Sequence, residues 1–193
     1  VITGFRSAPG GAQEYLGVTP DLATFGKTVA NGFPLSVVAG IKEVMSIISP
    51  DQGKVAFGGT YNGNQIVVAA ADAVLDKMKD GSVQKHMIKL TDKLINSFNT
   101  FAKEEGITAR LQGFGGKFQI YFTDHEVYNW RTAVDVDKEQ YSRLQNEILQ
   151  QNILFVTSPY SHNALTGAHT EEEVDTALEN VKSIVRNFEK KRG

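Results

Sequence analysis

The sequence predicts an α/β fold in its first half and a smaller α+β lobe in its second half. Up to about residue 81, short apolar strands alternate with helical segments and glycine-rich turns, which is typical of α/β architecture. A long amphipathic helix is expected over residues 82–105, followed by three short strand candidates and two further helices. The expected domain division is therefore 1–81, a linking helix at 82–105, and 106–193.

The composition is that of an ordinary globular protein, with 41% hydrophobic and 22% charged residues. The 20 basic and 22 acidic residues give a formal net charge of -2 and form no basic patch, so we expect no nucleic-acid or membrane partner. The chain has no cysteine and no apolar run near the roughly 20 residues of a membrane span, which favours a cytoplasmic protein. Its four histidines form no i,i+4 ligand pair, so we expect no metal site. Its start at Val1 predicts a piece of a longer polypeptide.

The first half is predicted to contain two strands and one buried helix. Residues 22–25 read as a short apolar strand, and residues 35–41 as a second, buried strand. Residues 4–17 are rich in glycine and are expected to be a loop, as are residues 49–53. Residues 65–78 are apolar on nearly every side, which predicts a buried helix.

The second half begins with the clearest helix of the chain. Ser82 is its expected cap, and its apolar residues recur every three or four positions to about Glu105: Val83, Met87, Leu90, Leu94, Phe98 and Phe101. Strands are expected at 107–111, at 118–122 and at 153–156. In the second of these, Phe118, Ile120 and Phe122 alternate with Gln119 and Tyr121.

Two capping boxes predict the later helices. Asp137 with Gln140 opens a helix that continues to about Ile148. Thr170 with Glu173 opens the last helix, whose apolar stripe is Val174, Leu178, Val181, Val185 and Phe188. The basic residues 190–192 suit the C-terminal end of that helix.

Lys27 is the main candidate for a reactive residue. It follows the apolar strand 22–25 and Gly26, which is expected to make the turn, so its stem would lie in apolar surroundings. Desolvation disfavours the ammonium form and leaves a free amine that can attack a carbonyl carbon. A solvated surface lysine is the alternative. A phosphate-binding P-loop ending at Gly26-Lys27-Thr28 is excluded, because that motif needs a glycine where this chain has Asp21.

A second candidate site precedes the helix predicted at 65–78. Residues 57–64 are rich in glycine and include Gly59 and Thr60. Free amides at a helix N-terminus, together with the Thr60 hydroxyl, suit a phosphate group. The alternative is a plain loop and helix cap.

Several stretches resemble a known family in order and spacing. They are VITGFR at 1–6, PGGAQ at 9–13, GVTPDL at 17–22, FGK at 25–27, GTYNGN at 59–64 and AHT at 168–170. Together they resemble the class III pyridoxal-phosphate aminotransferases, and in particular their glutamate-1-semialdehyde 2,1-aminomutase branch. The resemblance is confined to the C-terminal half of that family.

The resemblance implies a fold, a cofactor and site residues. Residues 1–81 would be the lysine-bearing part of the large domain of a fold-type I enzyme that binds pyridoxal 5'-phosphate, and residues 106–193 its small C-terminal domain. Lys27 matches the lysine that forms a Schiff base with the cofactor and then carries the proton. Gly59 and Thr60 match the position that reaches the cofactor phosphate of the other subunit, which implies a homodimer with shared active sites. The small-molecule partners would be an amino donor and a carbonyl acceptor.

Two departures from the family pattern define the remaining expectations. The family's aspartate for the pyridine nitrogen, its first phosphate loop and its ring-stacking aromatic all precede the position of Val1. We therefore expect this chain to be inactive without the missing N-terminal half. Ser161 lies where the aminomutase carries a glutamate, which favours an ordinary aminotransferase. The aminomutase itself and a non-catalytic scaffold domain are the alternatives.

Overall fold

A computed structural model describes residues 1–48 and 53–189. The chain divides into two compact units, Val1–Lys85 and His86–Gly193, and the boundary between them falls within one long helix. The three-part domain division stays a prediction. Residues 49–52 of the predicted loop and the basic residues 190–192 lie outside the described residues.

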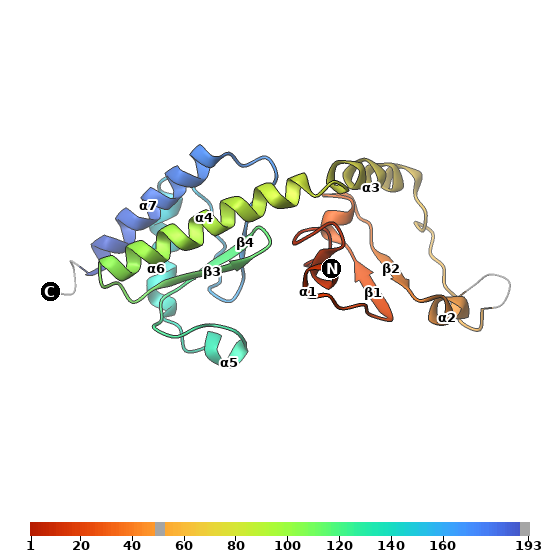
Figure 1. Ribbon diagram of the computed structural model, residues 1–193, viewed down its shortest axis with the longest axis horizontal. Coiled ribbons are helices and arrows are strands. Elements are labelled where there is room, and N and C mark those ends of the chain that lie inside the picture. Colours follow the sequence, from red (N-terminus) through yellow and green to blue (C-terminus); the bar gives the residue numbers. More distant parts are fainter. Residues whose placement is uncertain (49–52, 190–193) are drawn as a thin grey trace. The chain divides into compact units, whose positions relative to one another are not determined.

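The first unit contains an antiparallel hairpin of β1 (Leu22–Phe25) and β2 (Val37–Gly40), in which Phe25 pairs with Val37 (Figure 1). The prediction of β1 is confirmed. The expectation of a buried second strand is wrong, because three of the four β2 residues are exposed. The hairpin forms a sheet of two strands, so among the described residues no third strand covers its edges.

Short helices complete this unit. The segment expected to be a loop at 4–17 contains α1 (Gly11–Leu16), which ends at Gly17 with φ 65, the left-handed conformation that closes many helices. The 3-10 turn η1 (Lys27–Val29) follows β1, and α2 (Lys42–Met45) and η2 (Ser46–Ile48) follow β2.

Helix α3 (Gln65–Met78) forms where it was predicted, but it is not a buried helix. Only Ala71 and Met78 are buried, whereas the side chain of Ile66 is 70% exposed. Ala71 packs on Val29 and Ala30, which fixes η1 against α3. The apolar sequence therefore forms a helix as predicted. The described residues bury only one side of that helix and leave its other apolar side chains exposed.

The second unit packs three helices with a three-stranded antiparallel sheet. The helices are α4 (Ser82–Glu104), α6 (Lys138–Leu149) and α7 (Glu171–Glu189), and a short α5 (Trp130–Ala133) precedes α6. The sheet order is β3 (Arg110–Phe114), β4 (Lys117–Tyr121), β5 (Asn163–Ala164). The predicted long helix and both capping-box helices are confirmed. The expectation that Ser82 caps the long helix is wrong, because Ser82 is the first residue of α4 and its N–H and hydroxyl both donate to Asp80 Oδ1, at 2.9 and 2.7 Å.

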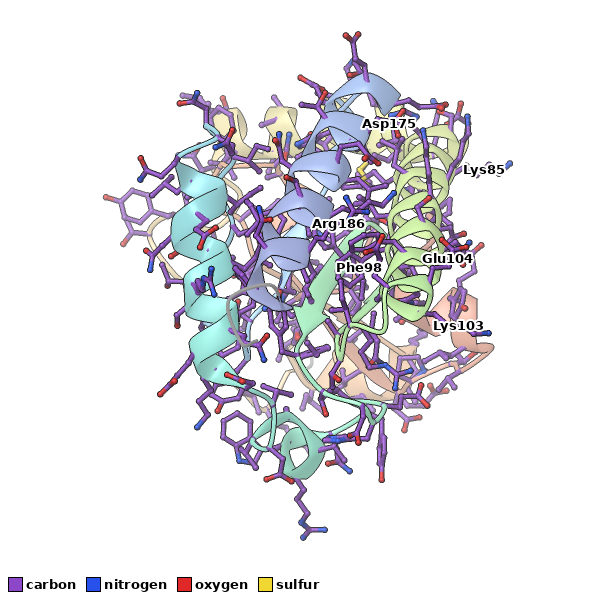
Figure 2. All side chains as sticks on the ribbon, turned by 90° about the vertical axis from the view of Figure 1, so that its left-hand side faces the viewer. Lys85, Phe98, Lys103, Glu104, Asp175 and Arg186 are labelled. Carbon is purple, nitrogen blue, oxygen red and sulfur yellow. The ribbon has the colours of Figure 1, made fainter. Side chains whose placement is uncertain are left out.

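The core of this unit gathers the predicted helix stripes and the inward residues of β3 and β4. Phe98 of α4 is fully buried and faces α7 and the sheet (Figure 2). Charged pairs at the surface join α7 to α4 and to the residue that follows α4: Lys93 contacts Asp175 at 2.5 Å, and Arg186 contacts Glu105 at 2.8 Å. Two helices drawn side by side in Figure 1 are thus held by apolar packing with ion pairs at its edge.

The strand expected at 153–156 is wrong, and the third strand is β5 instead. The main-chain N–H and carbonyl of Val156 form hydrogen bonds with side chains and not with a neighbouring strand. Its N–H donates to Asn163 Oδ1 at 2.9 Å, and its carbonyl accepts the Tyr141 hydroxyl at 2.8 Å. With both groups already satisfied, this segment has no need to join a sheet.

Candidate functional site

Lys27 lies directly after β1, and its own backbone makes the turn. Its φ is 52, in the left-handed region that residues with a Cβ seldom adopt. The expectation that Gly26 makes the turn is wrong, because Gly26 is extended with φ -170. The main-chain N–H groups of Ala30 and Asn31 donate to the Lys27 carbonyl at 3.4 and 3.1 Å, which holds the turn in place. Strained residues held in this way cluster at functional sites.

The Lys27 side chain is exposed. The apolar seat expected for its stem is not formed by the residues that the structure describes. The neighbouring residues Gly26, Val29 and Ala30 are buried, whereas Lys27 between them is exposed to solvent.

Arg6 anchors the turn that carries Lys27, and sequence reasoning missed it. Its Nε donates to Thr28 Oγ1 at 2.6 Å, and its Nη1 donates to the Ile2 carbonyl at 3.0 Å. Burial lowers the pKa of the Arg6 guanidinium. The signal was present in the sequence, because Arg6 is the only charged side chain in the first 13 residues.

Gly59 and Thr60 lie in the exposed loop before α3. Asn64 caps this helix, with its Oδ1 accepting the main-chain N–H groups of Ile66 at 3.1 Å and Val67 at 3.3 Å. The expectation of free helix amides for a phosphate is therefore wrong for these two groups. Within residues 1–48 and 53–189, the Thr60 hydroxyl has no hydrogen-bond partner, so it remains available to a ligand.

Packing connects the Lys27 turn to the helix that follows Thr60. Val29 and Ala30 of the turn contact Ala71 of α3, with Val67 of the same helix against this cluster. The structure thus attaches the candidate lysine and the candidate phosphate loop to one packed element. Ser161 belongs to the second unit.

Ser161 is exposed and lies in the loop that leads into β5. With Ser158 and Asn163 it lines a cleft of about 1000 Å3 within the second unit. The rest of the lining is mainly apolar, and the polar side chains of His169, Glu172 and Glu173 also border it. The neighbouring Tyr160 packs on Trp130, with ring centroids 4.9 Å apart.

Gln119 is a second residue whose contacts sequence reasoning did not predict. Alternation along β4 suggested a polar, outward position, but the side chain is only 2% exposed. Its amide nitrogen lies 3.2 Å from the carbonyl oxygens of Ser158, Pro159 and Ser161. A glutamine between Phe118 and Ile120 carries no local signal that distinguishes this role from solvent exposure.

Two absences concern residues 1–48 and 53–189 as a whole. No group of three or more His, Cys, Asp or Glu side chains among them could hold a metal ion. None of their helices combines the length and apolarity that crossing a bilayer requires.

Solved structures share this fold. An omega-transaminase from Sphaerobacter thermophilus matches 96% of the chain with a TM-score of 0.82 at 25% identity, over 42% of its own length. A glutamate-1-semialdehyde-aminomutase from Pseudomonas aeruginosa, solved in complex with PMP, matches 93% of the chain with a TM-score of 0.80 at 20% identity. The predicted α/β transaminase fold is confirmed.

Curated relatives and a family model agree with the fold. Glutamate-1-semialdehyde 2,1-aminomutase from Methanobrevibacter smithii is 37% identical over all 193 residues, and the enzyme of that name from Methanosarcina acetivorans is 36% identical over 179. The chain spans 45% and 42% of the length of these two relatives. The family model described as aminotransferase class-III matches residues 1–181. The chain therefore belongs to the class-III aminotransferase family.

Proposed function

We propose that the natural polypeptide containing these residues is a pyridoxal-phosphate-dependent aminotransferase that moves an amino group from a small-molecule donor to a carbonyl acceptor. The observation that carries the proposal is the state of Lys27. Within residues 1–48 and 53–189 its amine has no hydrogen-bond or ion-pair partner, and its strained turn is held by Asn31 and by the Arg6 contact to Thr28. A side-chain nitrogen that no competing partner occupies, on a fixed backbone, suits covalent attachment to an aldehyde.

The residues present fit the cofactor in three respects. With respect to the residues that the structure describes, Lys27 offers an unpaired amine, Thr60 an unpaired hydroxyl, and Gly59 leaves its main chain accessible in an exposed loop. When bound, pyridoxal phosphate supplies the aldehyde carbon and the electron-accepting ring. Lys27 would hold it covalently and move a proton at Nζ, while the Gly59 amide and the Thr60 hydroxyl would donate to the phosphate of the cofactor that the other subunit holds.

The remaining parts of the proposal concern assembly. The chain spans less than half of its relatives, and Ile66 and other apolar residues of α3 are exposed. We infer that an N-terminal half and a second subunit complete the site, in a homodimer with shared active sites. The missing part would supply the enclosure that Lys27 lacks here. We place the enzyme in the cytoplasm.

The substrate distinguishes two candidate activities. The exposed, uncharged Ser161 where the aminomutase carries a glutamate favours transfer to a separate carbonyl acceptor. The names of relatives 36% and 37% identical favour the second candidate, glutamate-1-semialdehyde 2,1-aminomutase. Release of the donor's keto acid during turnover would establish the transferase, whereas isomerisation of glutamate-1-semialdehyde without keto-acid release would establish the mutase.

The test of the proposal uses the natural polypeptide loaded with pyridoxal phosphate and treated with borohydride. We expect visible absorption before reduction and a covalent label on Lys27 afterwards. Lys27→Ala should lose both. Lys42→Ala, which removes another exposed lysine of the same unit, should keep both. A label that persists in Lys27→Ala would refute the assignment, and a colourless polypeptide would favour a non-catalytic scaffold.

A further inference from the structure

Gln119 lies in the interior of the second unit, on the middle strand of the sheet. A buried primary amide carries two N–H donors and one carbonyl acceptor, and each must find a partner to avoid a cost in stability. The partners that Gln119 finds lie on its own strand, on the segment that lines the cleft and on α6, where Tyr141 shares a side-chain hydrogen bond with it.

The donor side of Gln119 holds the loop. Its nitrogen lies 3.2 Å from each of three carbonyl oxygens, those of Ser158, Pro159 and Ser161. Two N–H groups serve three acceptors, so at least one of them is shared. The loop closes on itself as well, because the Ser161 N–H donates to the Ser158 carbonyl at 3.2 Å.

The acceptor side connects Gln119 to β5. Its Oε1 accepts from Asn163 Nδ2 at 3.0 Å and from the Ile120 N–H at 3.1 Å. Asn163 Oδ1 in turn accepts from the Val156 N–H, and the Val156 carbonyl accepts from the hydroxyl of the buried Tyr141. Both ends of the 156–163 segment are therefore held by one buried network.

We infer that Gln119 is a positioning residue for the substrate pocket: its amide fixes the main chain of residues 158–161 and so determines where Ser161 stands in the cleft. The inference rests on the proposed function, because it takes this loop to contact the carbonyl substrate. It also predicts a property of the loop that needs neither cofactor nor substrate. Gln119 does not touch the reacting atoms, and it acts through the loop alone.

The chain provides a matched control. Gln112 pairs directly with Gln119 across β3 and β4 and makes the same kind of contact with a different loop. Its Nε2 donates to the Val127 carbonyl at 3.0 Å, and its Oε1 accepts the Val127 N–H at 2.9 Å. Replacing either glutamine by methionine keeps the size of the side chain and removes its hydrogen bonds.

The first experiment measures amide hydrogen exchange in the natural polypeptide. In Gln119→Met, exchange at Ser161 should become at least about tenfold faster, while Val127 stays within about twofold. In Gln112→Met the pattern should be reversed. Gln119→Glu keeps the acceptor but removes both donors, so it should also loosen Ser161, and it serves if the methionine variant does not fold. Unchanged exchange at Ser161 in a folded variant would overturn the inference.

The second experiment measures steady-state kinetics. Gln119→Met should raise KM for the carbonyl acceptor at least about fivefold, while KM for the amino donor in the same assay and cofactor absorption change less than about twofold. Gln112→Met should leave all three near their original values. Faster loop exchange with an unchanged KM would refute the link to substrate. A polypeptide that binds no cofactor would refute the proposed function while leaving the exchange result to decide whether Gln119 holds the loop.

Discussion

The main-chain N–H of Asn31 donates to the carbonyl oxygen of Lys27 at 3.1 Å, and both residues have left-handed backbone, with φ of 40 and 52. The turn therefore begins and ends in a conformation that costs L-residues roughly 1 kcal/mol or more each. Val29, which lies between these two residues, is buried against α3, and this packing holds the strained turn and the lysine in a fixed position.

Replacing Lys27 separates its backbone role from its chemistry. Glycine adopts a φ of 52 without a Cβ penalty, whereas alanine retains the penalty. We expect Lys27→Gly to be more stable than Lys27→Ala by about 1 kcal/mol in urea unfolding. At Lys42, which has ordinary helical geometry in α2, the order should be inverted, with alanine the more stable. Equal stability of the two Lys27 variants would contradict the strained turn.

A glutamate at position 161 should move activity toward the aminomutase reaction. The family resemblance predicts a carboxylate at this position in the aminomutase, and Ser161 is exposed at a cleft, so the longer side chain can be accommodated. In Ser161→Glu of the natural polypeptide we expect isomerisation of glutamate-1-semialdehyde to rise about tenfold, equivalent to about 1.4 kcal/mol. Thr157→Glu adds the same charge to the same loop and should produce no such gain. An equal response of both variants would point to a general effect of charge.

Removing the Tyr141 hydroxyl should weaken the network behind the loop. Burial raises the pKa of this phenol, so it stays protonated and donates to the Val156 carbonyl at 2.8 Å. Tyr141→Phe leaves that carbonyl without its donor, and we expect a loss of about 1–2 kcal/mol in the free energy of unfolding. Tyr128→Phe is the control, because Tyr128 is 75% exposed, and its cost should stay below about 0.5 kcal/mol. Comparable losses in the two variants would exclude a special role for Tyr141.

The first turn of α7 should lose stability in acid. The Thr170 main-chain N–H and hydroxyl donate to Glu173 Oε2 at 2.8 and 3.1 Å, which lowers the pKa of the Glu173 carboxyl below its ordinary value. The stabilisation is complete above the ordinary glutamate pKa of about 4.3 and is lost as pH falls through the lowered value. Carbon NMR titration should place the Glu173 midpoint below the ordinary value, and Thr170→Val should raise it. A midpoint that does not respond to Thr170→Val would count against the hydroxyl contact.

Sequence patterns predicted the local elements well. The stripe from Val83 to Phe101 and the capping box of Thr170 with Glu173 join residues three or four positions apart, so helix geometry alone brings them together. Family motifs likewise identified Lys27 as a candidate, because such motifs lie in short contiguous stretches.

Burial and strand pairing were predicted less well. Both properties depend on which distant residues pack against a segment. This applies to the exposed faces of α3 and β2, to the absence of a strand at 153–156 and to the burial of Gln119. The roles of Lys27, Gly59, Thr60 and Ser161 stay predictions, because the contacts proposed for them are with a cofactor, a substrate and a second subunit.

By itself the sequence determined the long helices α3, α4, α6 and α7, the caps of α6 and α7, the family and the position of the candidate lysine, since each depends on residues close together along the chain. Only the tertiary structure decided that Lys27 bears the left-handed turn, that Arg6 anchors it and that Gln119 holds the Ser161 loop. Gln119 and Asn163 are 44 positions apart. The cost of removing a buried amide from water is offset only when folding brings such hydrogen-bond partners together.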